Sequence, residues 1–319
     1  MNKNNLFTSN FKENFIFSCK LLIFLFCILA YINYVMPQYE GAYTASLLDK
    51  MNRLQSIDEP KIVLIGNSNL AFGICSEMME EELGMPVVNM GLHGGLSNRF
   101  HENMAKCNVR EGDIYIVCHT QYWDDDSIGD AVLTWTVIEN HLELWRLLQG
   151  KDIGPMIEAF PTYLKKCLGL HLDGEGNKDP GGCYSRSAFN VYGDVCVLRE
   201  NSKYIFENEI WPFAVGDITV ERLNELNVFL EERGATLLVA GYPIGNGELT
   251  VEPEKFVEAQ TYLEEGLECP VISDFTDYMF DYQYFYDTEY HMNTEGVILR
   301  TEQLISDIKQ WKKLEIEKR

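Results

Sequence analysis

The sequence predicts an α/β fold with a mostly parallel sheet, preceded by a single membrane-spanning helix. Short apolar runs alternate along the chain with segments of helical periodicity, which is typical of parallel strands joined by helices. Residues 15–35 form an apolar stretch that is long enough to cross a bilayer as a helix. The length of 319 residues fits one large domain together with such an anchor.

The apolar stretch is expected to be a retained anchor at the cell membrane. Lys3 and Lys12 precede it, which favours a cytoplasmic N-terminus and an extracytoplasmic body. A cleaved signal peptide is the alternative, but no small-residue cleavage site directly follows the apolar run. We therefore expect residues 1–38 to form a cytoplasmic tip and transmembrane signal anchor, and residues 39–319 to form one extracytoplasmic domain.

Composition excludes some classes of function. The formal net charge of −23 would repel phosphate, so nucleic-acid binding is not expected. The nine cysteines show no CxxC pair and no zinc-ligand spacing, so the sequence predicts no metal site and no cofactor. Cys167, Cys183 and Cys196 lie in or beside a loop-rich segment, where the sequence leaves a disulfide bridge open.

The expected elements alternate along the chain. Five strands are expected, at residues 61–65, 87–90, 113–118, 235–240 and 270–273. Helical patterns cover residues 43–54, 76–83, 98–109, 127–148, 153–168, 217–233 and 252–266, and a last helix follows Gly296. Residues 169–216 are rich in glycine and polar side chains, so an irregular insert that shapes a substrate cleft is expected there.

A candidate nucleophile, Ser68, follows the first expected strand. The run Gly66-Asn67-Ser68-Asn69 is a polar turn between that strand and a helix. Such a turn lies at the carboxyl edge of the sheet, where open α/β sheets keep their sites, and the helix behind it favours developing negative charge. An ordinary junction between strand and helix is the alternative.

A candidate base and its partner lie near the other end of the chain. His291 is preceded by Asp287, and a nearby carboxylate can hold a histidine in one tautomer. Serine early with Asp and His late is a known order for nucleophilic catalysis, although His291 could instead pack against the final helix. If the two segments meet, the Ser68 hydroxyl is expected within about 3.5 Å of a His291 ring nitrogen.

These segments resemble the conserved blocks of the SGNH, or GDSL-like, hydrolases. The run from Gly66 to Asn69 resembles their Gly-Asp-Ser turn, Gly94 stands at the glycine of their second block, and Gln121 stands where their third block has Asn. The similarity spans roughly residues 61–311. It is closest to membrane-anchored SGNH-like proteins of bacterial envelope gene clusters, which share an anchor, a Gly-x-Ser-Asn turn and a Tyr-His-(Leu/Met)-Asn-x-x-Gly ending.

The resemblance implies a three-layer sandwich with a mostly parallel five-stranded sheet, an SGNH or flavodoxin-like fold. It implies Ser68 as nucleophile, His291 as base and Asp287 as the partner that orients the base. The oxyanion hole would comprise the backbone N–H groups of Ser68 and Gly94 and the side-chain amide of Gln121. Here Asp and His are four residues apart, whereas the family has three.

The expected function is that of a serine esterase or O-acyltransferase acting on ester groups of cell-envelope glycans. A membrane-bound O-acyltransferase would be a partner, with membrane contact through residues 15–35. The alternatives are a non-catalytic polysaccharide-binding or assembly protein and, less favoured, a two-carboxylate glycosidase. Candidate substrate contacts are Asn69, His93 and His119. Aromatic residues of the insert, such as Tyr184, could stack on sugar faces or pack the insert onto the body.

Overall fold

A parallel sheet forms the centre of the domain. The computed structural model describes residues 11–120, 126–139, 141–200, 209–212 and 216–317. Within these residues the main sheet has four strands in the order β2-β1-β3-β4, and all neighbouring pairs are parallel. The strands are β1 (Ile62–Ile65), β2 (Val87–Asn89), β3 (Ile114–Val117) and β4 (Thr236–Val239).

The prediction of a fifth strand at residues 270–273 is corrected by the structure. Only one parallel bridge forms there, between Val239 and Val271, with two backbone hydrogen bonds of 2.8 and 2.9 Å around it. Beyond this bridge, Ser273 is buried and its hydroxyl donates to Asp307 of α10 at 2.5 Å. A separate pair of strands, β5 (Ile244–Asn246) and β6 (Met279–Asp281), is also parallel.

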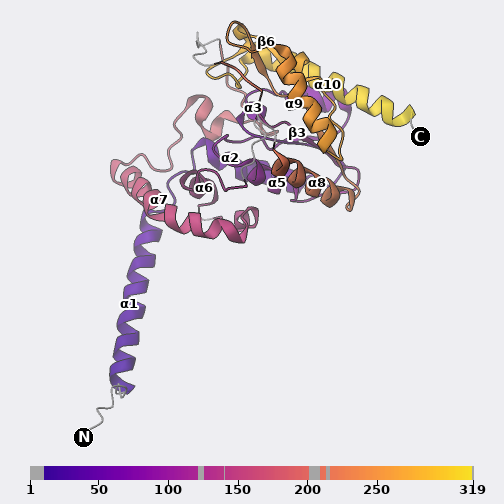
Figure 1. Cartoon of the computed structure of the whole chain (residues 1–319). Helices are drawn as coiled ribbons and strands as arrows, with labels where there is room; N and C mark the ends of the chain where they lie inside the picture. Colours follow the sequence, from indigo (N-terminus) through magenta and orange to yellow (C-terminus); the bar gives the residue numbers. More distant parts are fainter. Residues whose placement is uncertain (1–10, 121–125, 140, 201–208, 213–215, 318–319) are drawn as a thin grey trace.

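Apart from α1, the described helices pack around the sheet and the β5–β6 pair (Figure 1). The helices are α1 (Phe11–Val35), α2 (Ser46–Ser56), α3 (Ser68–Ala71), α4 (Ser76–Leu83), α5 (Asn98–Ala105), α6 (Ala131–Ile138), α7 (Ile153–Asp173), α8 (Asp217–Glu231), α9 (Pro253–Gly266) and α10 (Thr294–Glu317). Short 3₁₀ helices lie at Tyr43–Ala45, Leu142–Leu147, Gly150–Asp152, Gly182–Tyr184, Arg186–Ala188, Phe275–Tyr278 and Tyr282–Tyr284.

Alternation of side chains along each strand builds two hydrophobic cores, one on each face of the sheet. On one face, Ile62 and Leu64 of β1 pack with α4 and α10. On the other face, Val63 and Ile65 pack with apolar side chains of α2, α5 and α8. All four β1 side chains are fully buried, which explains why this strand is a continuous apolar run in the sequence.

The expected helix over residues 127–148 is interrupted. The structure has α6 and then a 3₁₀ helix at Leu142–Leu147. After α6, the Glu139 carboxylate accepts the backbone N–H groups of Gln38 at 3.1 Å and Tyr39 at 2.6 Å. Local periodicity does not register such a contact because its partners lie about a hundred residues away along the chain. The expected insert is shortened at its start, since α7 continues to Asp173.

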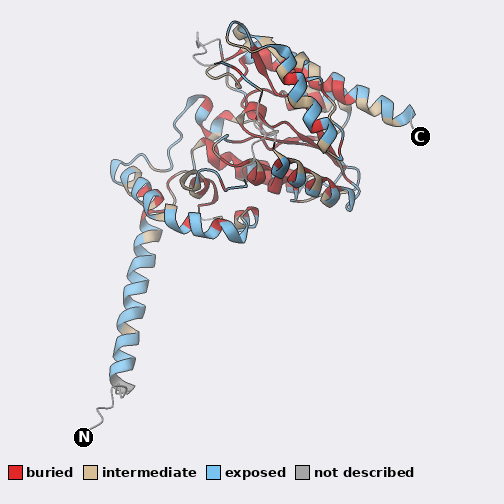
Figure 2. Cartoon of the chain, in the orientation of Figure 1, coloured by how far each residue is buried: buried red, intermediate tan, exposed pale blue. Residues whose placement is uncertain are grey.

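One helix, α1, projects from the body as a straight rod (Figure 1). Residues Glu13–Val35 of α1 are long and apolar enough to cross a membrane, and this is the one such helix among the described residues. Its side chains are exposed along most of its length (Figure 2). At its end, Val35 and Met36 are buried against Tyr163 and Cys167 of α7, so the body begins where the apolar helix stops.

Candidate active site

The turn after β1 is shaped by close contact with the end of β3. A Cβ atom at Gly66 would lie 2.6 Å from the carbonyl oxygen of Cys118, so only glycine fits at this point. Asn67 then caps α3, because its side-chain oxygen accepts the N–H of Asn69 at 3.0 Å. Ser68 is therefore the first residue of α3, and its backbone N–H has no acceptor within the helix. The turn lies between β1 and β3, where the strand order reverses.

Asn69 stabilises this turn through hydrogen bonds inside the domain. It is fully buried, donates to the carbonyl of Cys118 at 2.9 Å and accepts Arg300 of α10 through its side-chain oxygen at 2.6 Å. Its backbone carbonyl accepts the same guanidinium at 2.5 Å. The prediction that Asn69 contacts substrate is therefore corrected: its hydrogen bonds are used inside the protein.

A tight loop presents the candidate base. Phe285 and Met292 form an antiparallel bridge, and the N–H of Tyr286 donates to the carbonyl of His291 at 2.8 Å. The Thr288 hydroxyl accepts the His291 N–H at 3.1 Å. These bonds fold the segment back on itself, so the spacing of four residues brings Asp287 beside His291.

The ending Tyr-His-Met-Asn-x-x-Gly joins this loop to α10. Asn293 accepts the N–H of Gly296 at 2.9 Å and donates to the carbonyl of Gln283 at 2.7 Å. A Cβ atom at Gly296 would lie 2.4 Å from the carbonyl oxygen of Tyr284. The Asn and Gly of this ending thus fix the direction of the loop relative to the helix.

Ser68, His291 and Asp287 form one hydrogen-bonded chain. His291 Nε2 lies 2.8 Å from the Ser68 hydroxyl, within the expected distance, and His291 Nδ1 lies 2.8 Å from Asp287 Oδ1. With Asp287 ionised, Nδ1 carries the proton and Nε2 offers its lone pair to the serine. Ser68 is more than 200 positions away from Asp287 and His291 in sequence, but the three residues meet at the carboxyl edge of the sheet.

Two aromatic residues, Tyr184 and Phe72, contact the hydrogen-bonded residues Asp287 and His291. The sequence alone does not predict these contacts. The Tyr184 hydroxyl donates to Asp287 Oδ2 at 2.5 Å and lies 3.3 Å from His291 Nδ1. The Phe72 ring stacks on the imidazole with a centroid distance of 4.1 Å and an interplanar angle of 9°. Phe72 follows the serine turn directly, whereas no local pattern connects Tyr184 of the insert with Asp287.

The hydrogen bonds around Asp287 favour the ionised form of its carboxyl group. Burial alone would raise the pKa of this carboxyl, but hydrogen bonds from His291 and Tyr184 outweigh burial and hold the pKa below its usual value. Burial and the neighbouring carboxylate raise the pKa of Tyr184, which therefore stays a neutral donor. An ionised carboxylate is the form that can hold the Nδ1 proton of His291.

Arg199 connects the elements that carry these residues. Its guanidinium is buried and donates to the carbonyls of Val195 at 2.6 Å, Phe72 at 3.1 Å and Met292 at 3.2 Å. It also lies over the Phe72 ring, 5.3 Å from the centroid. One side chain from the insert thus ties the helical turn after Ser68 to the residue that follows His291.

The remaining predicted site residues lie in different surroundings. Gly94 is exposed, and the nearest atom to a Cβ placed there would be Asn67 Nδ2 at 3.9 Å, so its backbone lies beside the serine turn. Gln121, predicted as an oxyanion donor, lies outside the described residues. His119 is fully buried and bonds Glu102 at 3.1 Å, so the prediction of a substrate contact is corrected to a role inside the domain.

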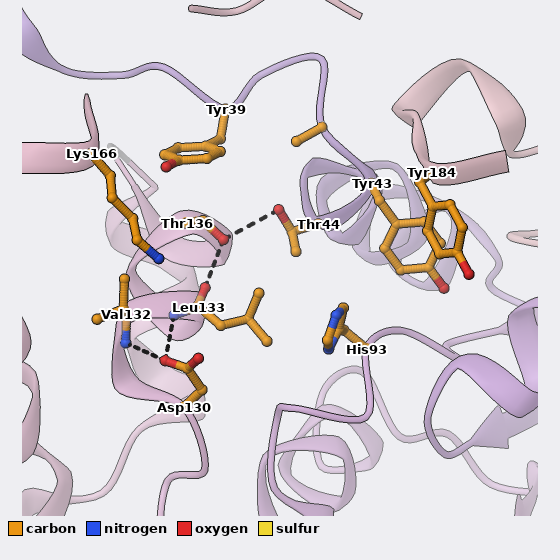
Figure 3. A pocket seen from close by; sticks show the side chains of 11 residues that line it. Tyr39, Tyr43, Thr44, His93, Asp130, Val132, Leu133, Thr136, Lys166 and Tyr184 are labelled. Atoms are coloured by element: carbon orange, nitrogen blue, oxygen red, sulfur yellow. Dashed lines mark hydrogen bonds between the residues drawn. The ribbon is translucent and has the colours of Figure 1, made fainter. Parts of the chain in front are cut away.

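His93, one residue before Gly94, lines a cavity of about 340 Å³. Its ring and that of Tyr184 both line this cavity (Figure 3). The N–H of Gly95 donates to His93 Nδ1 at 2.8 Å, so the neutral ring carries its proton on Nε2. Desolvation and the nearby His291 lower the pKa of His93, which favours this neutral form.

Comparison with family models, with curated proteins and with solved structures finds no match. All nine cysteines are free thiols. Within the described residues, no group of three or more His, Cys, Asp or Glu side chains could hold a metal ion.

Proposed function

We propose that this chain is a membrane-anchored serine enzyme of the SGNH-like type that cleaves or transfers acyl esters of cell-envelope glycans. The observation that carries the proposal is the continuous chain from Ser68 through His291 to Asp287, with both hydrogen bonds at 2.8 Å. A nucleophile bonded to a base, and a base bonded to an orienting acid, is the arrangement that covalent acyl transfer requires.

The proposed first half-reaction forms an acyl-enzyme. Ser68 Oγ bonds to the ester carbonyl carbon while His291 Nε2 takes the hydroxyl proton. The carbonyl oxygen becomes an oxyanion, for which the backbone N–H groups of Ser68 and Gly94 are the proposed donors. Collapse of this intermediate breaks the bond to the leaving alcohol, which receives the proton from His291.

The second half-reaction decides between the two forms of the activity. Water or a sugar hydroxyl attacks the acyl-enzyme, loses its proton to His291 and releases Ser68 as the proton returns to Oγ. Water gives an esterase and a sugar hydroxyl gives an O-acyltransferase. A membrane-bound O-acyltransferase is the proposed partner for the transferase.

The proposed location is the outer face of the cell membrane. The apolar helix α1 supports an anchor, and the lysines before it support a cytoplasmic N-terminus. The packing of Val35 and Met36 against α7 would hold the body close to the bilayer surface. A body placed there has access to envelope glycans and to acyl groups delivered through the membrane.

Turnover of p-nitrophenyl acetate by the full-length protein tests the proposal. Ser68→Ala and His291→Ala should each lower kcat/KM by about 10³-fold or more. The nucleophile and the base act as a unit, so removing either one costs most of the rate enhancement that the unit supplies. Ser56→Ala, at the exposed end of α2, is a matched control and should leave kcat/KM unchanged. Wild-type turnover no faster than in Ser68→Ala would favour the alternative, a non-catalytic polysaccharide-binding or assembly protein.

A further inference from the structure

We propose that the cavity beside the catalytic chain is a binding site for a single pyranose sugar. This inference rests on the proposed function and names the ligand that would deliver or accept the acyl group. The cavity of about 340 Å³ lies at the small end of the range for ligand sites, about 300–1,000 Å³. Its lining comes from the segment after α1, from the loop after β2, from α6, from α7 and from the insert.

Tyr184 connects the cavity with the hydrogen-bonded residues Ser68, His291 and Asp287, which do not line it themselves. Tyr184 contributes ring surface to the cavity while its hydroxyl donates to Asp287. His93 also lines the cavity, one residue before Gly94 in the sequence. A ligand in the cavity would therefore be separated from Asp287 by one side chain, that of Tyr184.

The tyrosine side chains that line the cavity would contact a ligand through their rings, because two of their hydroxyl groups already bond within the protein. The Tyr43 hydroxyl is occupied by the carbonyl of Leu92 at 3.1 Å, and that of Tyr184 by Asp287. In Figure 3 the Tyr43 and Tyr184 rings lie together on one side and Tyr39 lies on the other. Aromatic faces of this kind pack against the C–H faces of a sugar ring.

The polar part of the lining offers donors and an acceptor around these rings. Lys166 of α7 forms no hydrogen bond or ion pair with any described residue. Asp130 uses Oδ1 to cap α6, accepting Val132 N–H at 2.8 Å and Leu133 N–H at 3.0 Å, and its Oδ2 has no partner in the described part of the chain. His93 adds a donor at Nε2. An acyl chain would desolvate these groups without pairing them, which costs free energy, whereas sugar hydroxyls pair with them.

Binding of simple glycosides to the full-length protein in detergent tests this assignment without any acyl donor. The probes are the methyl β-glycosides of glucose, N-acetylglucosamine and glucuronic acid, followed by saturation-transfer NMR and titration. At least one glycoside should bind. Leu133→Trp, which fills the cavity, should weaken that binding at least tenfold, and Lys166→Met about fivefold.

Lys165→Met is the matched control, because Lys165 is the exposed neighbour of Lys166 on α7 and does not line the cavity. It should bind the glycoside as the wild type does. No binding of any of the three probes, or binding unaffected by either cavity variant, would overturn the assignment. If Leu133→Trp lowers the melting temperature, the exposed Lys166→Met variant alone decides.

The sugar-binding experiment and the catalytic proposal can fail independently of each other. Sugar binding that depends on Lys166, together with no acylation of Ser68, would contradict the catalytic proposal and leave the sugar site standing. Acylation of Ser68 without sugar binding would do the reverse.

Discussion

At the residue scale, Asp287 receives a donor on each of its two oxygens. His291 occupies Oδ1 and Tyr184 occupies Oδ2, so the carboxylate is held in a fixed orientation. A carboxylate that is bonded twice remains ionised to lower pH than an isolated one. Tyr184 is therefore expected to act through Asp287, as a positioning residue.

Tyr184→Phe removes one donor to the ionised form of Asp287 and so raises the pKa of that carboxyl. The acidic limb of kcat/KM against pH should move to higher pH, because protonated Asp287 no longer holds the Nδ1 proton of His291. At neutral pH we expect a loss of about tenfold, in keeping with about 1.5–3 kcal/mol for a hydrogen bond to a charged group. The measurement is a pH–rate profile with p-nitrophenyl acetate.

The control for this substitution is Tyr192→Phe. Tyr192 also belongs to the insert, but its ring lies over Arg53 and forms no hydrogen bond or ring contact with Ser68, His291 or Asp287 among the described residues, so it serves as the control. An acidic limb that stays in place in Tyr184→Phe, or moves equally in Tyr192→Phe, would contradict the role given to Tyr184.

Single residues also show how far the sequence could predict the site. Ser68, Asp287 and His291 could be found because each lies in a local pattern with its own chemistry. Asn69 and His119 are fully buried, which the sequence does not predict because position after a strand does not tell whether a side chain points to solvent or into the core. Tyr184 could not be assigned because its partner lies 103 positions away and no spacing connects them.

At the element scale, Arg199 fastens three segments by donating to their carbonyl groups. Burial without a described carboxylate partner lowers the pKa of this guanidinium, so the hydrogen bonds to carbonyls carry its stabilisation. Removing the side chain would leave several carbonyls unsatisfied and would release Phe72 from the stack on His291.

Arg199→Ala should lower the free energy of unfolding by about 3 kcal/mol and kcat/KM by at least tenfold. Arg186→Ala is the matched control from the same insert, since Arg186 pairs with Asp49 at the surface. A surface ion pair contributes about 0–1 kcal/mol, so little change is expected there. Denaturant unfolding measures the free energy of unfolding, and p-nitrophenyl acetate turnover measures kcat/KM. Equal losses of both in the two variants would refute the role of Arg199 in joining these segments.

The elements that the sequence predicts well are those whose bounds are set by local patterns. Buried parallel strands such as β1 are continuous apolar runs, and α4 has its predicted bounds, with Gly84 in the left-handed conformation after its last turn. Where α6 ends and where the fifth strand is missing, Glu139 and Ser273 bond to partners that lie far along the chain. Periodicity contains no information on such contacts.

At the scale of the whole molecule, the cavity proposed to bind a sugar lies on the side of the body from which α1 projects. Tyr39, which follows α1 after three residues, and Lys166 of α7 both line it. If α1 crosses the membrane, the cavity lies near the bilayer surface, within reach of a membrane-attached glycan or acyl donor.

The proposed topology predicts that protease added to intact protoplasts digests the body, because residues beyond α1 would lie outside. A cytoplasmic protein followed in the same sample should survive until the protoplasts are lysed. Protection of the body in intact protoplasts, with digestion after lysis, would show the opposite orientation.

The central claim is that Ser68 is a nucleophile activated by His291, and covalent labelling tests it most directly. Full-length protein treated with a fluorophosphonate, or with isotopically labelled p-nitrophenyl acetate, should carry one adduct that peptide mass spectrometry locates on Ser68. His291→Ala should lose this adduct and Ser56→Ala should retain it. An adduct on another residue, or labelling of Ser68 that persists at the wild-type rate in His291→Ala, would contradict the account.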